Sequence, residues 1–247
     1  MNACVRAARE PKPDVIRDEN QVSGFFSRGT WLRLMPGSLR LHPSRVLALG
    51  AHPDDVELGC GGSLSRLAKD GAEVHSAVFT RCEDETPDDP DLRFRECEAA
   101  AVTLGLKRVR VFEFPNRQLP EHRLEVMIEM EKLQAAVQPD LVFIPFLEDP
   151  HQDHETVARA AIRAFRRRET ILEFEILRYG SHTFTPSLFV DIGASIDTKV
   201  AALRQYKSQF ARRAYFDEES FRSLARTRGA QSGYDYAEGF VIYKMFW

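Results

Sequence analysis

Hydrophobic residues recur along residues 45–177 in two alternating patterns. Short apolar runs predict strands at residues 45–50, 73–79, 108–112, 140–144 and 172–177. Between them, apolar residues three or four positions apart predict helices at residues 62–70, 92–104, 126–137 and 154–167. Strands that alternate with helices are typical of a parallel sheet with right-handed crossovers. We therefore expect an α/β fold, a doubly wound, Rossmann-like, mainly parallel sheet flanked by helices.

The two ends of the chain depart from this alternation. A C-terminal αβ elaboration of the same domain is predicted from a strand at 188–192, helices at 197–210 and 217–226, and a last strand at 239–244. Residues 1–44 mix basic and acidic residues with prolines and contain few core-forming side chains. We expect them to form an N-terminal extension that is partly disordered or contacts another subunit, and we expect one domain at residues 45–247.

Composition excludes several classes of protein. The 247 residues contain 34 Lys and Arg against 37 Asp and Glu, a net charge of −3, which gives no electrostatic basis for nucleic-acid binding. No segment approaches the ~18 consecutive apolar residues of a membrane span, and the charged N-terminus lacks the apolar core of a signal peptide. The four cysteines show no paired spacing, which argues against a disulfide framework or a cysteine zinc knuckle. The sequence predicts a cytoplasmic enzyme with reduced thiols.

Two clusters of histidine and aspartate follow the first and fourth predicted strands. The first is Ala-His-Pro-Asp-Asp at residues 51–55, and the second is His-Gln-Asp-His at residues 151–154. In doubly wound sheets the ligand crevice lies at the carboxyl ends of the strands, where the strand order reverses. With the common order 3-2-1-4-5, that reversal falls between strands one and four, so we expect both clusters to line one crevice.

Two imidazoles and one carboxylate form the ligand set of an open catalytic zinc site. His52, Asp55 and His154 supply this set and leave a fourth position for water. The same ligands also accept Fe²⁺ or Co²⁺. Zinc lowers the pKa of a bound water molecule to about 7, so that it can act as a nucleophile at neutral pH.

The remaining polar residues of the clusters suit supporting roles. Asp54 is a candidate general base directed towards the water. His151 is a candidate proton donor to a leaving amine, or a hydrogen-bond donor to the oxyanion. Asp153 is a candidate to hold an imidazole in its working tautomer. Each cluster alone also fits ordinary turn or helix-capping chemistry; it is their convergence that favours a metal site.

Three glycines directly after the first cluster invite comparison with a dinucleotide-binding loop. Gly59, Gly61 and Gly62 fail the fingerprint because Leu64 occupies the position of its third glycine. We expect these glycines to allow close packing beneath the site and to leave backbone N–H groups available.

The motifs together resemble the PIG-L/LmbE-like family of zinc-dependent N-deacetylases, of the N-acetylglucosaminyl deacetylase type. The resemblance rests on residues 51–62 and 151–154, extends to softer matches between residues 93 and 240, and leaves the N-terminal extension unmatched. Val56, where the commoner motif has Glu, and Arg81-Cys82, where many members have a Thr-Asp-Gly turn, depart from it.

The resemblance implies roles for individual residues. It implies that His52, Asp55 and His154 are metal ligands, that Asp54 is the general base, and that His151 is an electrostatic or acid partner supported by Asp153. Arg93 matches an arginine that reaches the substrate in relatives, although an exposed helix arginine paired with Glu96 is an equal alternative.

From these motifs we expect a hydrolase that removes an N-acetyl or other N-acyl group from a small molecule containing an amino sugar, by attack of a metal-activated water. The resemblance also implies a homo-oligomer, a trimer or hexamer, which the aromatic residues of the extension would suit. One alternative is a non-haem Fe(II) enzyme with a 2-His-1-carboxylate site. Another is a non-catalytic, metal-stabilised carbohydrate-binding protein.

Overall fold

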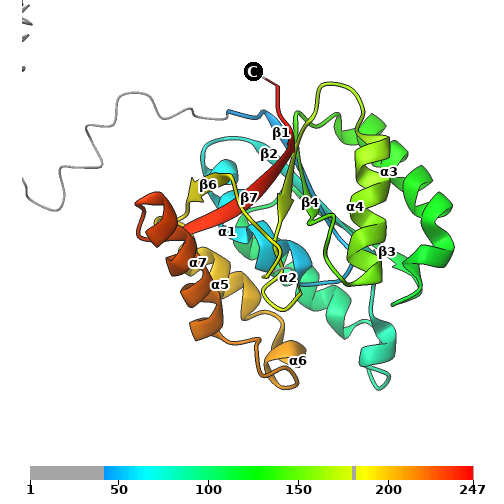
Figure 1. The fold of residues 1–247 in the computed structure, drawn as a ribbon. Coiled ribbons are helices and arrows are strands. Elements are labelled where there is room, and N and C mark those ends of the chain that lie inside the picture. The colour runs from blue at the N-terminus through cyan, green and yellow to red at the C-terminus, as the bar shows by residue number, and fades with distance from the viewer. Residues whose placement is uncertain (1–41, 180–181, 247) are drawn as a thin grey trace, which may run out of the picture. The chain divides into compact units, whose positions relative to one another are not determined.

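The computed structural model describes residues 42–179 and 182–246, which form a seven-stranded sheet between two layers of helices (Figure 1). The strand order is β3-β2-β1-β4-β5-β7-β6. The strands are β1 (Arg45–Gly50), β2 (Glu73–Thr80), β3 (Arg108–Phe114), β4 (Leu141–Pro145), β5 (Thr170–Phe174), β6 (Leu188–Asp191) and β7 (Ala237–Lys244). Neighbours from β3 through β5 pair in parallel, and β7 pairs antiparallel with both β5 and β6.

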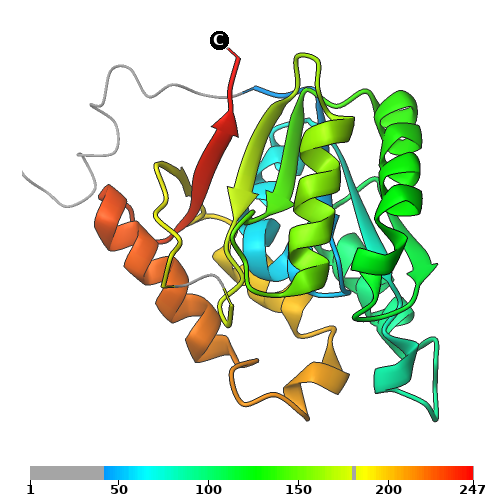
Figure 2. The ribbon, with the colours of Figure 1, turned by 45° about the vertical axis from the view of Figure 1, so that its right-hand side comes forward.

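Helices cover both faces of the sheet. They are α1 (Asp55–Lys69), α2 (Leu92–Leu104), α3 (Arg123–Val137), α4 (Gln152–Ala164), α5 (Ile196–Leu203), α6 (Lys207–Phe210) and α7 (Glu218–Ser232). In Figures 1 and 2, α3 and α4 lie on one side of the sheet and α1, α2, α5 and α7 lie on the other. Two buried hydrophobic clusters match these layers, one beneath each set of helices. None of the helices in residues 42–179 and 182–246 is long and apolar enough to span a membrane.

The sheet confirms the doubly wound fold predicted from the sequence. The order β3-β2-β1-β4-β5 reverses between β1 and β4, as expected, and places the segments that follow these two strands side by side. The expected extension lies almost wholly in residues 1–41, outside the described residues. The C-terminal elaboration consists of α5, α6, α7 and the antiparallel strands β6 and β7.

Helix boundaries differ most from the predictions at α1. The sequence predicts a helix from residue 62, but α1 begins at Asp55 and contains the three glycines. The predicted start was wrong because the apolar spacing that indicates a helix becomes regular only from Leu64, whereas the expected close packing at the glycines is present within the helix itself. A Cβ on Gly59 would lie 2.0 Å from Cδ2 of Phe174 in β5, so the helix can approach the sheet only without a side chain at this position.

Three other helix predictions also need correction. The segment predicted as one helix at residues 197–210 is broken into α5 and α6, and α7 continues to Ser232, beyond the predicted end at residue 226. The N-terminus of α4 lies before residue 154, because His151 is its N-cap and accepts a hydrogen bond from the Asp153 N–H.

A buried ion pair from the C-terminal elaboration contacts the middle of α1. The ammonium of Lys199 donates to the carbonyl oxygen of Leu58 and lies 2.6 Å from Glu238. Glu238 in turn accepts hydrogen bonds from the N–H groups of Gly62 and Ser63 at 2.9 and 2.7 Å. The backbone N–H groups near the glycines, which were expected to be available, therefore donate to Glu238 and connect α1 to β7.

Candidate active site

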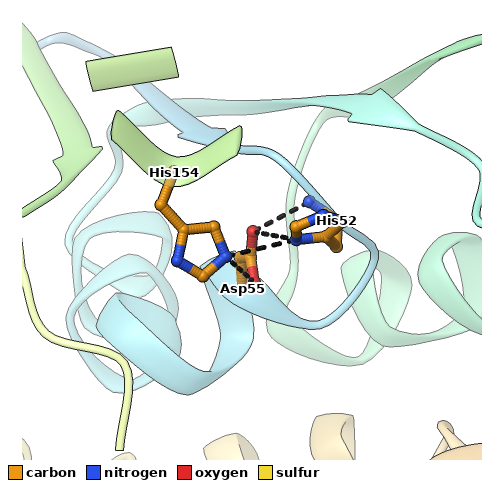
Figure 3. Close-up of side chains that lie close together, drawn as sticks. All are labelled: His52, Asp55 and His154. Carbon is orange, nitrogen blue, oxygen red and sulfur yellow. Dashed lines mark hydrogen bonds and ion pairs between the residues drawn. The ribbon is translucent and has the colours of Figure 1, made fainter. Parts of the chain in front are cut away.

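The segments after β1 and β4 bring two histidines and an aspartate together. His52 follows β1, Asp55 begins α1, and His154 lies in the first turn of α4 (Figure 3). Nδ1 of His52 lies 3.2 Å from Nε2 of His154, and these atoms lie 3.4 Å from Oδ2 and Oδ1 of Asp55 respectively. Bond lengths of about 2.0–2.1 Å around a tetrahedral zinc ion put neighbouring ligand atoms roughly 3.3 Å apart. The spacing of the three side chains therefore fits a metal ion.

The backbone fixes the orientation of Asp55. Its Oδ2 accepts hydrogen bonds from the N–H groups of Ala51 and His52 at 2.9 and 2.8 Å. Burial would raise the pKa of Asp55, but the imidazoles of His154 and His52 outweigh burial and hold the pKa well below its usual range. The carboxylate is thus ionised and can act as a ligand at neutral pH.

Each candidate histidine ligand has an acidic partner on its outer side. Oδ2 of Asp153 lies 3.1 Å from Nε2 of His52, and Oδ2 of Asp149 lies 3.1 Å from Nδ1 of His154. Burial lowers the pKa of His154, but Asp55 and Asp149 raise it to about 10 in the protein without a metal. Carboxylates on the distal nitrogen fix the tautomer and raise the basicity of metal-binding histidines.

Asp149 was not singled out in the sequence. It lies in the same six-residue segment as His151 and His154, and an acidic residue beside two histidines was the signal available. Asp153 was singled out, and the structure shows which imidazole its carboxylate contacts. That carboxylate contacts the ring of His52, and it also accepts from the N–H groups of Arg117 and Leu119 at 2.7 and 3.1 Å.

Asp54 lies beside the three candidate metal ligands in an unusual backbone conformation. Its φ is 104°, in the region that favours glycine, and it precedes the first turn of α1. Such conformations concentrate at functional sites, where the surrounding structure holds them in place. Burial raises the pKa of Asp54 to about 6, against the opposing effect of the Arg93 guanidinium.

Arg93 on α2 is fully buried behind Asp54. Its Nη2 donates to Oδ2 of Asp54 at 3.0 Å and to the carbonyl oxygen of Pro53, and its Nη1 donates to Glu85 at 2.6 Å. The side chain is only 1% exposed. The expected alternative pairing with Glu96 is wrong, because the carboxylate of Glu96 accepts from the N–H and hydroxyl of Ser208 instead.

His151 stacks on His154 at the mouth of the site. Their ring centroids are 4.5 Å apart, and Nδ1 of His151 accepts from the Asp153 N–H at 3.2 Å. Burial, together with the rings of His52 and His154, lowers the pKa of His151 to about 4. The ring is therefore neutral at physiological pH, and this hydrogen bond assigns its proton to Nε2.

A pocket of about 220 Å³ opens beside these residues. It contains every site residue expected from the sequence except Asp153, which lies behind His52. The pocket is lined by His52, Asp54, Asp55, Leu58, Cys82, Glu85, Arg93, Asn116, Arg117, His151, His154, Ile176, Arg178, Tyr179, Arg213 and Tyr215. Sequence analysis did not predict the lining residues that follow β5 or α6, because only the tertiary fold brings those segments to the site.

Comparison with known proteins identifies the kind of protein that this chain is similar to. The model of the family described as PIG-L, GlcNAc-PI de-N-acetylase, matches residues 47–165. Diacetylchitobiose deacetylase of Thermococcus kodakarensis is 30% identical over 221 residues, which cover 79% of this chain and 81% of that protein.

Two solved structures share the fold. The conserved protein TT1542 of Thermus thermophilus is 32% identical, with a TM-score of 0.70 over 82% of this chain and 96% of that one. N,N'-diacetylchitobiose deacetylase of Pyrococcus horikoshii, solved with an inhibitor, is 26% identical, with a TM-score of 0.71 over 81% of this chain and 84% of that one.

Proposed function

This chain belongs to the PIG-L family, and from that premise we propose that it is a metal-dependent N-deacetylase acting on a small molecule that contains an N-acetylated amino sugar. The observation that carries the proposal is the convergence of His52, Asp55 and His154 on one point at the wall of an open pocket. In the overall reaction, water cleaves the amide C–N bond, and acetate and the free amine are released.

We propose that these three side chains hold zinc. Their ligand atoms lie at tetrahedral spacing and are buried, and two nitrogens with one carboxylate oxygen form a donor set that zinc shares with Fe²⁺ and Co²⁺. A divalent ion at this site supplies Lewis acidity, which polarises the acetamide carbonyl and acidifies a water molecule. The carboxylates of Asp153 and Asp149 keep the two imidazoles oriented towards the ion.

Asp54 is the proposed general base. It lines the pocket next to Asp55, and its pKa of about 6 leaves it ionised at neutral pH yet basic enough to accept a proton from water. Arg93 positions the proposed base, because its guanidinium donates a hydrogen bond to Oδ2 of Asp54. The same guanidinium opposes the rise in the pKa of Asp54 that burial causes. The other oxygen of the carboxylate remains for the attacking water.

His151 is the proposed stabiliser of the oxyanion. With its proton on Nε2 and its ring on the pocket wall, it can donate a hydrogen bond to the oxygen of the former acetamide carbonyl. Its lowered pKa argues for a neutral hydrogen-bond donor and against a protonated acid at the start of the reaction.

The lining of the pocket suits an N-acetylated sugar. Leu58 and Ile176 give a small apolar surface for the acetyl methyl group, while Tyr179, Tyr215 and Asn116 offer rings and an amide to the sugar. Relatives named as diacetylchitobiose deacetylases support this substrate class. Neither alternative from the sequence is favoured by these relatives, and the pocket beside the ligand set argues against a purely structural metal.

A cytoplasmic location and a homo-oligomer complete the proposal. The buried thiols of Cys60, Cys82 and Cys97 are free, which fits a reducing compartment.

The trimer or hexamer is proposed from the family resemblance. The mass of the full chain by light scattering, compared with a variant lacking residues 1–40, tests both the assembly and the part of the extension in it.

Acetate release from a panel of N-acetylglucosamine glycosides tests the proposed function. The zinc-loaded protein should release acetate, and Asp54→Ala should reduce the rate by about 100-fold or more. Asp235→Ala is the matched control, since Asp235 is exposed and is not part of the pocket lining. Equal rates for wild type and Asp54→Ala would remove the proposed base, and dependence of turnover on oxygen would instead favour the Fe(II) alternative.

A further inference from the structure

A second cavity adjoins the proposed active-site pocket at Leu58. This inner cavity measures about 20 Å³, which is the scale of one water molecule. Leu58 is common to the lining of the inner cavity and to that of the pocket. The residue is only 6% exposed. Its side chain therefore forms part of the wall between the two spaces.

The segment after β5 continues this wall. Ile176 lines the pocket, whereas Glu175 and Leu177 on either side of it line the inner cavity. The chain thus passes between the two spaces and presents side chains to both. Leu58 from α1 and Ile176 from this segment are the apolar side chains that the pocket presents on this side.

The lining of the inner cavity suits an alkyl chain. Its apolar side chains come from α1, α7, β7 and the segment after β5, and they are Leu58, Leu177, Phe221, Leu224, Ala225 and Ala237. The charged side chains of the lining form two ion pairs. Arg228 donates to both carboxylate oxygens of Glu175 at 2.7 Å, and Lys199 lies 2.6 Å from Glu238. Because these charges are already paired, an alkyl group beside them leaves none of them without a partner.

Leu58 lies close to the point where the acyl group reacts. It is one helical turn beyond Asp54 and Asp55, and its N–H donates to the carbonyl oxygen of Asp54 at 2.9 Å. Since Leu58 is enclosed and adjoins the inner cavity, it faces the closed end of the pocket. With the amide carbonyl at the proposed metal site, the small acyl group fits this closed end, while the sugar extends towards the opening.

Building on the proposed function, we propose that Leu58 limits the substrate to short N-acyl groups, because its side chain closes the pocket against the inner cavity. The wild type then accepts N-acetyl and rejects N-butyryl groups. Alanine lacks the isopropyl group of leucine, which is larger than the ethylene unit by which butyryl exceeds acetyl. Leu58→Ala therefore joins the inner cavity to the pocket and makes room for the longer chain.

Glucosaminides with N-acyl groups of increasing length test this limit in the zinc-loaded full chain. The value of kcat/KM for release of acetate, propionate and butyrate is measured for the wild type, Leu58→Ala and Leu58→Val, the smaller truncation. Leu67→Ala is the matched control, since it makes the same change on the same helix outside both linings. The double variant Leu58→Ala/Ala225→Leu fills the inner cavity again from α7.

The wild type should prefer the N-acetyl over the N-butyryl substrate by roughly ten- to hundredfold in kcat/KM. Leu58→Ala should raise the ratio of butyrate to acetate release by about tenfold or more. Leu58→Val should raise the ratio of propionate to acetate release, which keeps the test open if Leu58→Ala does not fold. Leu67→Ala should retain the wild-type ratios, and the double variant should return towards them.

Three results would overturn the acyl limit. The first is wild-type ratios in folded Leu58→Ala and Leu58→Val. The second is a double variant that keeps the whole gain, because the longer chain would then lie outside the inner cavity. The third is an equal gain in Leu67→Ala, which would assign the effect to a loosened α1.

Binding measurements separate this inference from the proposed function. If no protein released any carboxylate, the deacetylase proposal would fail, and calorimetry with the intact glycosides would test the wall alone. Leu58→Ala should then bind the N-butyryl glycoside about tenfold more tightly than the wild type does, and equal binding would overturn the acyl limit as well. If the wild type released acetate but Leu58→Ala kept its ratios, the acyl limit alone would fail.

Discussion

Arg93 donates a hydrogen bond from Nη2 to Oδ2 of Asp54 across 3.0 Å, from a guanidinium that is 1% exposed. The same guanidinium contacts Glu85 at 2.6 Å, and Glu85 also lies 2.8 Å from Arg213. The proposed base is therefore connected through Arg93 and Glu85 to Arg213, which also lines the pocket. Its position and its pKa both depend on a residue that lies on another helix.

Replacing Arg93 should move the acid limb of the pH profile. The base must be ionised, so kcat/KM should fall as the pH falls through the pKa of Asp54, about 6 without a bound metal. Arg93 lowers this pKa, and Arg93→Gln should therefore shift the acid limb to higher pH. Arg95→Gln, an exposed position on the same helix, is the control. An unchanged limb in a folded, metal-loaded Arg93→Gln would contradict the role of Arg93.

Removing either acidic partner of the histidines should weaken metal binding. Asp153→Asn and Asp149→Asn each leave all three ligands in place but remove the carboxylate behind one imidazole. We expect zinc affinity to fall by about 10- to 100-fold in each, measured by competition with a chelator. Glu148→Gln, an exposed neighbour of Asp149, should leave the affinity unchanged. Wild-type affinity in both Asn variants would show that these carboxylates do not tune the site.

Replacing His151 should slow the chemical step without changing zinc binding. His151→Phe retains a ring to stack on His154 but lacks the Nε2 donor. We expect kcat to fall by about 100-fold, the usual effect of losing one oxyanion donor, with zinc content unchanged. His151→Gln, which offers a donor from a similar position, should restore part of the rate. A variant with normal kcat would exclude His151 from the reaction.

The protein without a metal should lose stability in alkaline solution. Asp55 and Asp149 raise the pKa of His154 from 6.5 to about 10, so the folded state binds a proton that the unfolded state releases near pH 6.5. The resulting stabilisation is complete below about pH 6.5 and is lost as the pH rises through about 10. Urea unfolding between these pH values should show a steeper decline for wild type than for His154→Gln. Parallel declines would mean that His154 is not protonated in the folded state.

Local patterns in the sequence identified the strands and the chemistry-bearing side chains, because both are encoded over a few consecutive residues. The apolar run at residues 45–50 corresponds to β1, and the reversal of strand order explains why His52 and His154 meet. Features that depend on distant contacts were missed. The early start of α1 follows from the packing of Gly59 against Phe174, which lies 115 positions away in sequence and only becomes a neighbour in the folded sheet.

The partners of charged residues show the same limit. Arg93 and Glu96 are spaced for an ion pair on one helix turn, yet each pairs with another segment of the chain. Local spacing shows which side chains can meet, whereas the tertiary fold brings Asp54 to Arg93 and Ser208 to Glu96. Arg178 likewise carries no local signal, because its place in the pocket depends on Tyr215 from the segment after α6.

The most direct test of the account is a zinc titration of the metal-free protein in which bound zinc and acetate release are measured together. Activity should rise in proportion to bound zinc and reach its maximum at one ion per chain, whereas Asp55→Asn should neither bind zinc tightly nor gain activity. Acetate release that is undiminished in the metal-free protein, or full activity in Asp55→Asn, would contradict the assignment of His52, Asp55 and His154 as the metal site of a deacetylase.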